Sequence, residues 1–141
     1  MVPPAPGASF ALAYQGALAP EAFAAFETLK EDIPEAGLLA ITSPDKLHSD
    51  WLAARRKARA GFGAPSWIET LLAPLAPGAT MVTVLDGHPA AHGWLGSVRG
   101  QKVVPLGVDR FGQAGDIPDL YREYGLDEAA ILDACAQALV S

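Results

Sequence analysis

Cysteine is almost absent from this sequence, because Cys135 is the only one in 141 residues. A single cysteine cannot form an internal disulfide, so a reducing, cytoplasmic compartment fits the composition best. Cys135 lies at helical spacing from Ile131 and Leu139, which predicts an inert thiol in a hydrophobic core. The first residues, Met1 to Pro4, have neither the basic start nor the apolar centre of a signal peptide.

Long apolar runs and basic charge are also scarce. No apolar stretch approaches the roughly 18 residues of a membrane-spanning helix. Ten Lys and Arg stand against sixteen Asp and Glu, and this net charge of −6 disfavours nucleic acid and anionic membrane as partners. One basic cluster exists, and we interpret it as a solvated helix flank or a contact with an acidic partner rather than a nucleic-acid site, since no aromatic residues interleave it. It consists of Arg55, Arg56, Lys57 and Arg59.

The motifs of a complete active site are missing as well. Ser97 lies in Leu-Gly-Ser-Val-Arg, which lacks the glycines of a nucleophile elbow. Gly93, Gly96 and Gly100 match neither a dinucleotide-binding fingerprint nor a Walker loop, and we expect Gly93 and Gly96 to let a helix approach the sheet. We therefore predict no catalytic, metal-binding or cofactor-binding residue in this chain.

What the sequence does contain is an alternation of short apolar runs with helical patterns, over a length that fits one domain. This alternation predicts an α/β fold: a three-layer α/β/α sandwich around a mostly parallel sheet of four or five strands. The strand order cannot be read from the sequence. The predicted strands are residues 10–14, 37–42, 80–85 and 102–108. The predicted helices begin near Pro20, Ser43, Ser66, Ala90, Asp116 and Asp127.

Several local features of these elements can be predicted. Residues 1–8 contain three prolines, so we interpret them as a linker without regular structure, followed by one domain over residues 9–141. Ser66 and Glu69 have the spacing of a capping box, and Asp127 is the expected N-cap of the last helix, with Leu126 packed on Ile131. The expected apolar stripes are Phe23, Phe26 and Leu29 in one helix, and Trp67, Leu71 and Leu75 in another.

Polar residues follow the clearest strand, at the edge where parallel sheets bind ligands. Asp86 and His88 are open to an acid–base pairing, but we favour Asp86 as the cap of the following helix. His88 and His92 are four residues apart, like a metal pair, yet His88 precedes Pro89 and is expected at the helix cap. A structural or interface role is therefore the favoured interpretation of both histidines.

Four stretches in the second half resemble a known family. Residues 82–88 (Val-Thr-Val-Leu-Asp-Gly-His) and 93–97 (Gly-Trp-Leu-Gly-Ser) resemble a strand and glycine-containing helix of the transketolase C-terminal domain. Residues 105–115 (Pro-Leu-Gly-Val-Asp-Arg-Phe-Gly-Gln-Ala-Gly) resemble its next strand and Phe-Gly loop. Residues 116–127 (Asp-Ile-Pro-Asp-Leu-Tyr-Arg-Glu-Tyr-Gly-Leu-Asp) resemble its closing helix. The sequence of residues 105–127 is most similar to that of the homodimeric decarboxylating component of pyruvate dehydrogenase.

This resemblance implies a supporting domain of a thiamine-diphosphate enzyme. In the family, thiamine diphosphate and Mg²⁺ are held by a Gly-Asp-Gly…Asn motif in an earlier domain, and the activating glutamate also lies elsewhere. Here Gly115-Asp116-Ile117 lacks the second glycine. The implied roles are subunit contact and shaping of the active-site entrance, with the preceding domains and the dimer mate as partners. The candidate interface or ligand-edge residues are Asp86, His88, His92, Arg110, Phe111 and Gln113.

Two alternatives remain open at this point. The parent enzyme is expected to oxidise and decarboxylate pyruvate, but a transketolase or another 2-oxoacid dehydrogenase is the nearest rival. A different class is a free-standing α/β module that binds a small anion at its strand ends.

Overall fold

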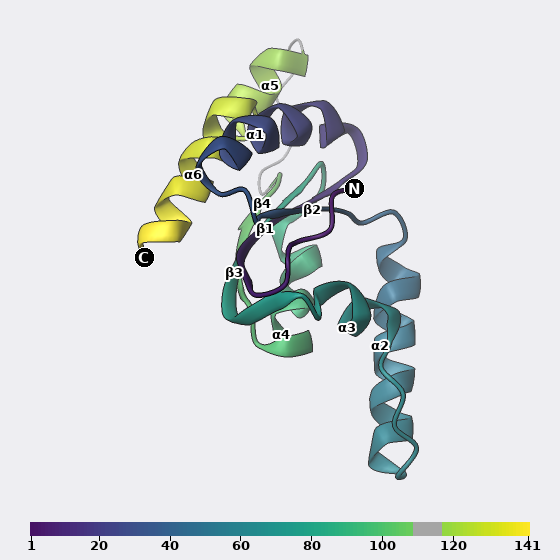
Figure 1. The fold of residues 1–141 in the computed structure, drawn as a ribbon. Helices are drawn as coiled ribbons and strands as arrows, with labels where there is room; N and C mark the ends of the chain where they lie inside the picture. The colour runs from purple at the N-terminus through teal and green to yellow at the C-terminus, as the bar shows by residue number, and fades with distance from the viewer. Residues whose placement is uncertain (109–116) are drawn as a thin grey trace.

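A computed structural model describes residues 1–108 and 117–141 of the chain (Figure 1). All four predicted strands are present, and they form one parallel sheet in the order β2-β1-β3-β4. The strands are β1 (Ala8–Gln15), β2 (Gly37–Ala40), β3 (Leu75–Leu85) and β4 (Lys102–Leu106). The predicted α/β/α sandwich is therefore confirmed.

Helices cover both faces of this sheet (Figure 1). One layer consists of α1 (Ala19–Asp32), α5 (Ile117–Glu123) and α6 (Glu128–Val140). The other consists of α2 (Pro44–Arg59), α3 (Trp67–Leu72), the 3-10 helix η2 (Pro89–Leu95) and α4 (Gly96–Arg99). A further 3-10 turn, η1 (Gly16–Leu18), links β1 to α1. In the described part of the chain, no helix has both the length and the apolar character needed to cross a membrane.

The alternation of side chains along β1 divides the core into two clusters. Phe10 and Leu12 point toward α1 and α6, whereas Ala11 and Ala13 point toward the opposite helical layer. All four side chains are fully buried. The central strand is therefore apolar on both faces, which is why its sequence is a nearly continuous hydrophobic run.

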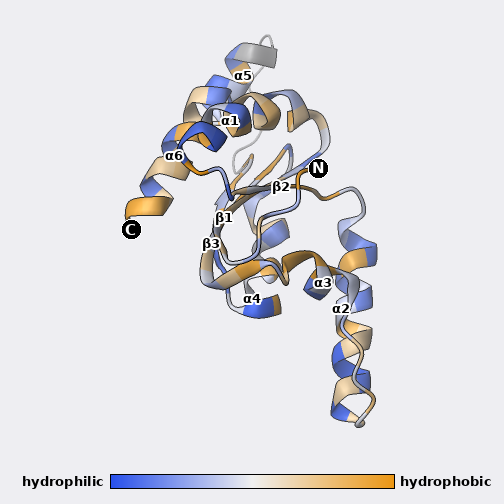
Figure 2. Ribbon diagram, viewed as in Figure 1, coloured by the Kyte–Doolittle hydropathy of each residue, from blue (hydrophilic) through white to orange (hydrophobic). Residues whose placement is uncertain are grey.

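Helix α1 confirms two of its three predicted core positions. Phe26 and Leu29 are buried together with Ala22 and Ala25, but Phe23 is 42% exposed. The Phe23 ring instead packs on Tyr14 at the border of the sheet, with the ring centroids 5.5 Å apart. Figure 2 shows hydrophobic and hydrophilic residues mixed along α1 and α2, as expected for helices that cover a core with one side only.

Helix α3 has the predicted capping box but a different buried face. The Ser66 Oγ accepts from the Glu69 N–H at 3.4 Å, and the Glu69 Oε2 accepts from the Ser66 N–H at 2.6 Å. The predicted stripe is wrong at Trp67, which is 61% exposed, because Ile68 and Leu72 face the core instead.

The N-terminal residues are more ordered than the linker interpretation predicted. Val2 forms an antiparallel bridge with Leu38 through two backbone hydrogen bonds of 2.8 Å. Pro4 is buried against Gly37, where an added Cβ would lie 2.7 Å from the proline ring. Ala8 already belongs to β1. Val2 and Pro4 therefore dock on β2, which is the edge strand of the described sheet.

Helix α2 continues beyond the body of the protein. It begins at Pro44, as predicted, although Ser43 makes no side-chain cap. Trp51 is its one buried residue, and every residue from 55 to 65 is exposed. We call residues 55–65 the arm, because Figure 1 shows this end of α2 and the returning segment extending away from the sheet.

Candidate functional site

The carboxyl ends of β1 and β3 form the point where such a sheet usually binds ligands. The chain leaves β1 toward β2 on one side and leaves β3 toward β4 on the other, so the two exits diverge. This divergence creates a crevice in open parallel sheets. Asp86, His88 and His92 follow β3 at this edge, where the sequence predicted them.

Asp86 binds back onto the protein itself. The Ala17 N–H in η1 donates to the Asp86 Oδ2 at 3.4 Å. The carboxylate also lies so close to Gly16 that an added Cβ would be 2.7 Å from Oδ1. The interpretation of Asp86 as a cap of the following helix is therefore wrong, because its carboxylate interacts with the turn that leads into α1. The protein places its own negative charge where a helix entrance would attract an anion.

His88 takes the capping position instead. Its Nδ1 accepts a hydrogen bond of 3.2 Å from the Ala90 N–H at the start of η2. This confirms that His88 sits at the cap. The hydrogen bonds of Asp86 and His88 therefore have different partners, Ala17 for one and Ala90 for the other. This arrangement gives no support to an acid–base pair.

His92 lies in η2 and is fully buried. Its Nε2 lies 2.6 Å from the Gln15 Oε1 at the end of β1, so with this oxygen as acceptor Nε2 carries the proton. Its Nδ1 is buried and makes no hydrogen bond to a described residue. Burial lowers the pKa of His92, so the ring is held neutral. Within the described ranges, no three potential ligands gather in a way that could hold a metal ion.

The buried ring predicts a stability that depends on pH. Folding lowers the pKa of His92 from 6.5, so below about pH 6.5 the unfolded chain binds more protons than the folded chain. Above that pH the ionisation of His92 should not lower the free energy of unfolding. Below it, the free energy of unfolding should decrease by at most about 1.4 kcal/mol per pH unit. Urea unfolding at about pH 7 and about pH 5.5 measures this decrease.

Two variants test the assignment to His92. His92→Gln should reduce the loss of stability at the lower pH, whereas His88→Asn, at an exposed position where Asn can also cap, should leave that loss unchanged. Equal decreases in all three proteins would contradict the assignment.

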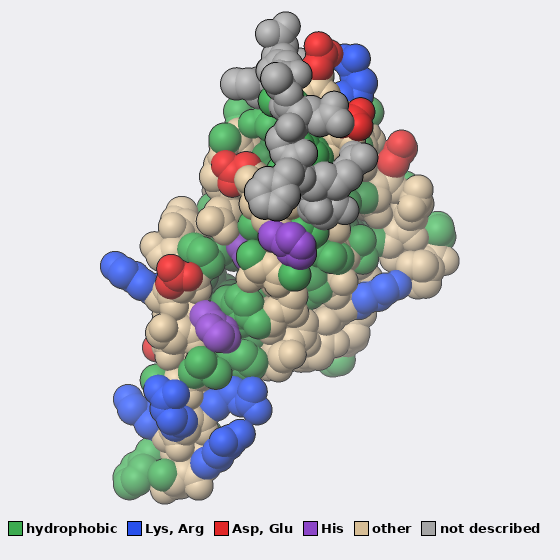
Figure 3. Space-filling view, turned by 180° about the vertical axis from the view of Figure 1, so that it is seen from behind, with side chains coloured by type: hydrophobic (Ala, Val, Ile, Leu, Met, Phe, Trp, Pro, Cys, Tyr) green, Lys and Arg blue, Asp and Glu red, His purple; other side chains and the backbone are tan. Residues whose placement is uncertain are grey.

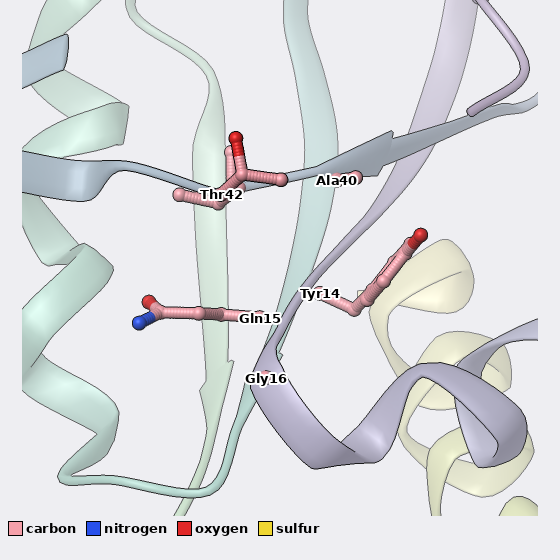
Figure 4. Close-up of a pocket in the computed structure, with 6 residues that line it drawn as sticks. Tyr14, Gln15, Gly16, Ala40 and Thr42 are labelled. Atoms are coloured by element: carbon pink, nitrogen blue, oxygen red, sulfur yellow. The ribbon is translucent and has the colours of Figure 1, made fainter.

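Two shallow hollows lie on either side of Gln15 at this edge. One, of about 390 Å³, is formed by the ends of β1 and β2 and includes Tyr14 and Thr42. The other, of about 300 Å³, includes His48 and His92. Figure 4 shows the Gln15 and Tyr14 side chains pointing to opposite sides of β1. Among the described residues that line the two hollows there is no serine, cysteine or lysine, so these residues offer none of those nucleophiles.

An aromatic cluster forms one wall of the second hollow. The His48, Trp51 and Trp94 rings contact one another in a triangle. The His48 centroid is 5.9 Å from that of Trp51 and 4.9 Å from that of Trp94, and the two indoles are 5.5 Å apart. The Arg55 guanidinium covers Trp51 from the arm side at 4.9 Å. Trp51 and Trp94 thus have the predicted packing role. Trp67 lies outside this cluster and is exposed.

Cys135 confirms its predicted place in the core. The residue is fully buried among the side chains between α1, α6 and the sheet, together with Ile131. Burial raises the pKa of the thiol to about 12, so the reactive thiolate is not populated near neutral pH. Asp127 also caps α6 as predicted, since its Oδ1 accepts from the Ala130 N–H at 3.0 Å.

Gly107 and Gln15 were not recognised from the sequence as parts of this edge. An added Cβ on Gly107 would lie 2.5 Å from the carbonyl oxygen of Gly87, and the Val108 N–H donates to the same oxygen at 2.8 Å. The end of β4 is thus joined to the end of β3 through backbone atoms. Gly96 makes the predicted close approach to β4, because an added Cβ there would lie 3.2 Å from the Val103 side chain. An added Cβ on Gly93 would meet no described atom within 4 Å.

The remaining predicted contact residues lie outside the described part of the chain. These are Arg110, Phe111 and Gln113, together with the expected helix cap Asp116. Their roles stay predictions.

The described residues define the class of the protein: a parallel four-stranded sheet between two helical layers, with a polar carboxyl edge bound largely to itself. No protein-family model matches the sequence, and a search of curated proteins returns no significant match.

Proposed function

We propose that this chain is a non-catalytic C-terminal domain of a thiamine-diphosphate-dependent enzyme similar to the homodimeric decarboxylating component of pyruvate dehydrogenase. The observation that carries the proposal is the state of the carboxyl edge. Asp86 accepts a hydrogen bond from the Ala17 N–H of η1, and His88 caps η2. The backbone at Gly107 lies close to the backbone at Gly87. An edge bound to itself in this way supports a structural role, such as contact with preceding domains and a dimer mate.

The first family motif falls on this same edge, and the second packs against the start of β4. Residues 82–88 form the end of β3 and the loop behind it, and residues 93–97 connect η2 to α4. A helix that begins close to β4 explains Gly96, the second of the two glycines in this motif. The first motif thus coincides with the contacts of the carboxyl edge and the second with the packing of a helix on β4, as expected of a domain that positions other parts of an enzyme.

The residues of this chain do not fit thiamine diphosphate or its Mg²⁺. The sequence lacks the Gly-Asp-Gly…Asn motif. The residues that the structure describes also provide no group of three metal ligands. In the proposal, cofactor and metal therefore belong to the preceding domains of a cytoplasmic parent enzyme, and this chain shapes the access to them. A transketolase or another 2-oxoacid dehydrogenase remains the alternative parent.

A free-standing module for small anions is the less favoured function. The N-terminal turn before α1 already faces the Asp86 carboxylate, which repels a phosphate or carboxylate ligand there. Asp45 lines the neighbouring hollow beside His48 and adds another acidic group. The observed charges therefore oppose an anion at both places.

Calorimetry and a domain replacement test the proposal together. The isolated chain, titrated with thiamine diphosphate and Mg²⁺, is expected to release no binding heat, because it lacks a diphosphate cradle. Fused behind the first two domains of a homodimeric pyruvate dehydrogenase component that has lost its own third domain, it should restore pyruvate-dependent reduction of an artificial electron acceptor. The truncated enzyme alone and the enzyme with its natural third domain are the controls.

Two results would overturn the proposal. One is one-to-one binding of the cofactor by the isolated chain at micromolar concentration. The other is a fusion that folds and dimerises but remains as inactive as the truncated enzyme. A fusion to a transketolase that regains activity, when the first fusion does not, would select the alternative parent.

A further inference from the structure

The arm has the properties of a segment that binds another surface. Its residues are all exposed, and Phe62 at its tip is 73% exposed. Four of its eleven residues are basic and none is acidic, although the protein as a whole carries a net charge of −6. Figure 3 shows the Lys and Arg side chains gathered on this extending end. A cationic segment with an aromatic tip is a common form of binding anchor.

A groove between α1 and α6 has the complementary properties. The hollow measures about 320 Å³, and Leu29, Ile33 and Leu132 contribute apolar side chains to it. Leu139 lies in the same hollow and is 40% exposed, so apolar surface remains open to solvent. We call this hollow, with the acidic residues beside it, the α1–α6 groove.

Acidic side chains border the apolar part of this groove. Asp32 and Asp133 are both exposed and line the hollow from α1 and α6. The two helices together contain six acidic residues and one basic residue, Lys30. A negative border around an apolar hollow matches a positive segment with an aromatic tip.

We propose that the arm of one molecule docks into the α1–α6 groove of a second copy of this chain, with Phe62 in the apolar hollow and the arm cations beside Asp32 and Asp133. In Figure 1 the arm extends from the end of the molecule opposite to α1 and α6, so the arm of one copy cannot reach the groove of the same copy. The contact is heterologous, because different surfaces of the two copies meet. This inference goes beyond the proposed function and does not depend on it.

The chemistry of the contact sets its expected strength. The arm is narrow, so the interface belongs to the small, weak class, and its dissociation constant should be micromolar or weaker. Cations and carboxylates at the border are largely solvent-exposed, so salt should weaken the contact because the screening length falls to a few ångströms near 1 M.

Sedimentation equilibrium of the full 141-residue chain tests the contact. At low salt the apparent mass should rise above the monomer mass of 14.7 kDa as the protein concentration increases, and it should fall back at high salt. The arm variant carries Arg59→Glu and Phe62→Ser, and the groove variant carries Asp32→Lys and Asp133→Lys. Each variant alone should stay monomeric. All four positions are exposed, so circular dichroism should show an unchanged fold.

Mixing the two variants gives the sharpest result. The arm variant keeps an intact groove and the groove variant keeps an intact arm, so an equimolar mixture should form one-to-one heterodimers with a single contact. Lys46→Glu combined with Phe23→Ser is the matched control, since it removes one cation and one exposed aromatic ring outside both surfaces and should still associate. A wild-type chain that stays monomeric at low salt, an arm variant that associates like the wild type, or a mixture that stays monomeric would each overturn the proposal.

Discussion

Phe26→Ala is expected to lower the free energy of unfolding by about 3–5 kcal/mol, a large part of the total stability of a domain this size. Phe26 is 1% exposed and lies in the core cluster between α1, α6 and the sheet. Truncation removes the transfer free energy of a buried ring and leaves a cavity in the layer where Phe10 and Leu12 also pack. Chemical denaturation monitored by circular dichroism should show a much lower midpoint.

Phe23→Ala is the matched control, three residues earlier in the same helix. Phe23 is 42% exposed, and its one described ring contact is with Tyr14. We expect this change to cost about 1 kcal/mol, because a single partly exposed aromatic contact is lost. Similar costs at the two positions would mean that α1 is rotated relative to the structure described here.

Gly107→Ala is expected to cost about 1–3 kcal/mol, or to displace the loop at the carboxyl edge. The new Cβ would lie 2.5 Å from the Gly87 carbonyl oxygen and 2.8 Å from the Pro89 nitrogen. These are backbone atoms, so no side chain can rotate away. The φ angle of Gly107 is outside the left-handed region, and the cost therefore comes from contact rather than from backbone strain.

Gly87→Ala provides the comparison on the other side of the same contact. Its Cβ would meet only the Leu85 Cδ1 at 3.4 Å, which is an ordinary distance. We expect a thermal unfolding midpoint close to that of the wild type, in contrast to the Gly107 variant. If both variants unfold alike, the ends of β3 and β4 are not in the close contact described.

The two comparisons have a common basis. In each, the sequence offers two residues of the same type, in one helix or at the ends of two neighbouring strands, and only the tertiary structure distinguishes them. The helical pattern of α1 admits both phenylalanines on one broad face, since three residues advance the helix by almost a full turn. The glycines before and after the edge contact are likewise alike in sequence, yet only one of them faces backbone atoms.

Much of the fold could be predicted because its determinants are local. Strands buried on both faces are continuous apolar runs, and alternating helices require parallel connections, so the sandwich and all four strands could be read from the sequence. The caps at Ser66 and Asp127 involve residues three positions apart, which the sequence displays directly. Cys135 follows from the helical spacing of apolar residues.

Less of the candidate site could be predicted, because its contacts join distant parts of the chain. The partner of Asp86 is Ala17, 69 residues away, and the partner of His92 is Gln15, 77 residues away. No local pattern indicates which strand ends become neighbours, and that depends on the order β2-β1-β3-β4.

The sequence by itself determined the α/β class, the parallel strands and the local caps, since these depend on residues close together in the chain. Only the tertiary structure decided the strand order, the exposure of Phe23 and Trp67, and the docking of Val2 on β2. It also revealed the arm, whose basic residues the sequence showed without indicating that the helix extends beyond the sheet. Burial and long-range pairing are collective properties of the packed layers, so they become definite only when all strands and helices are in place.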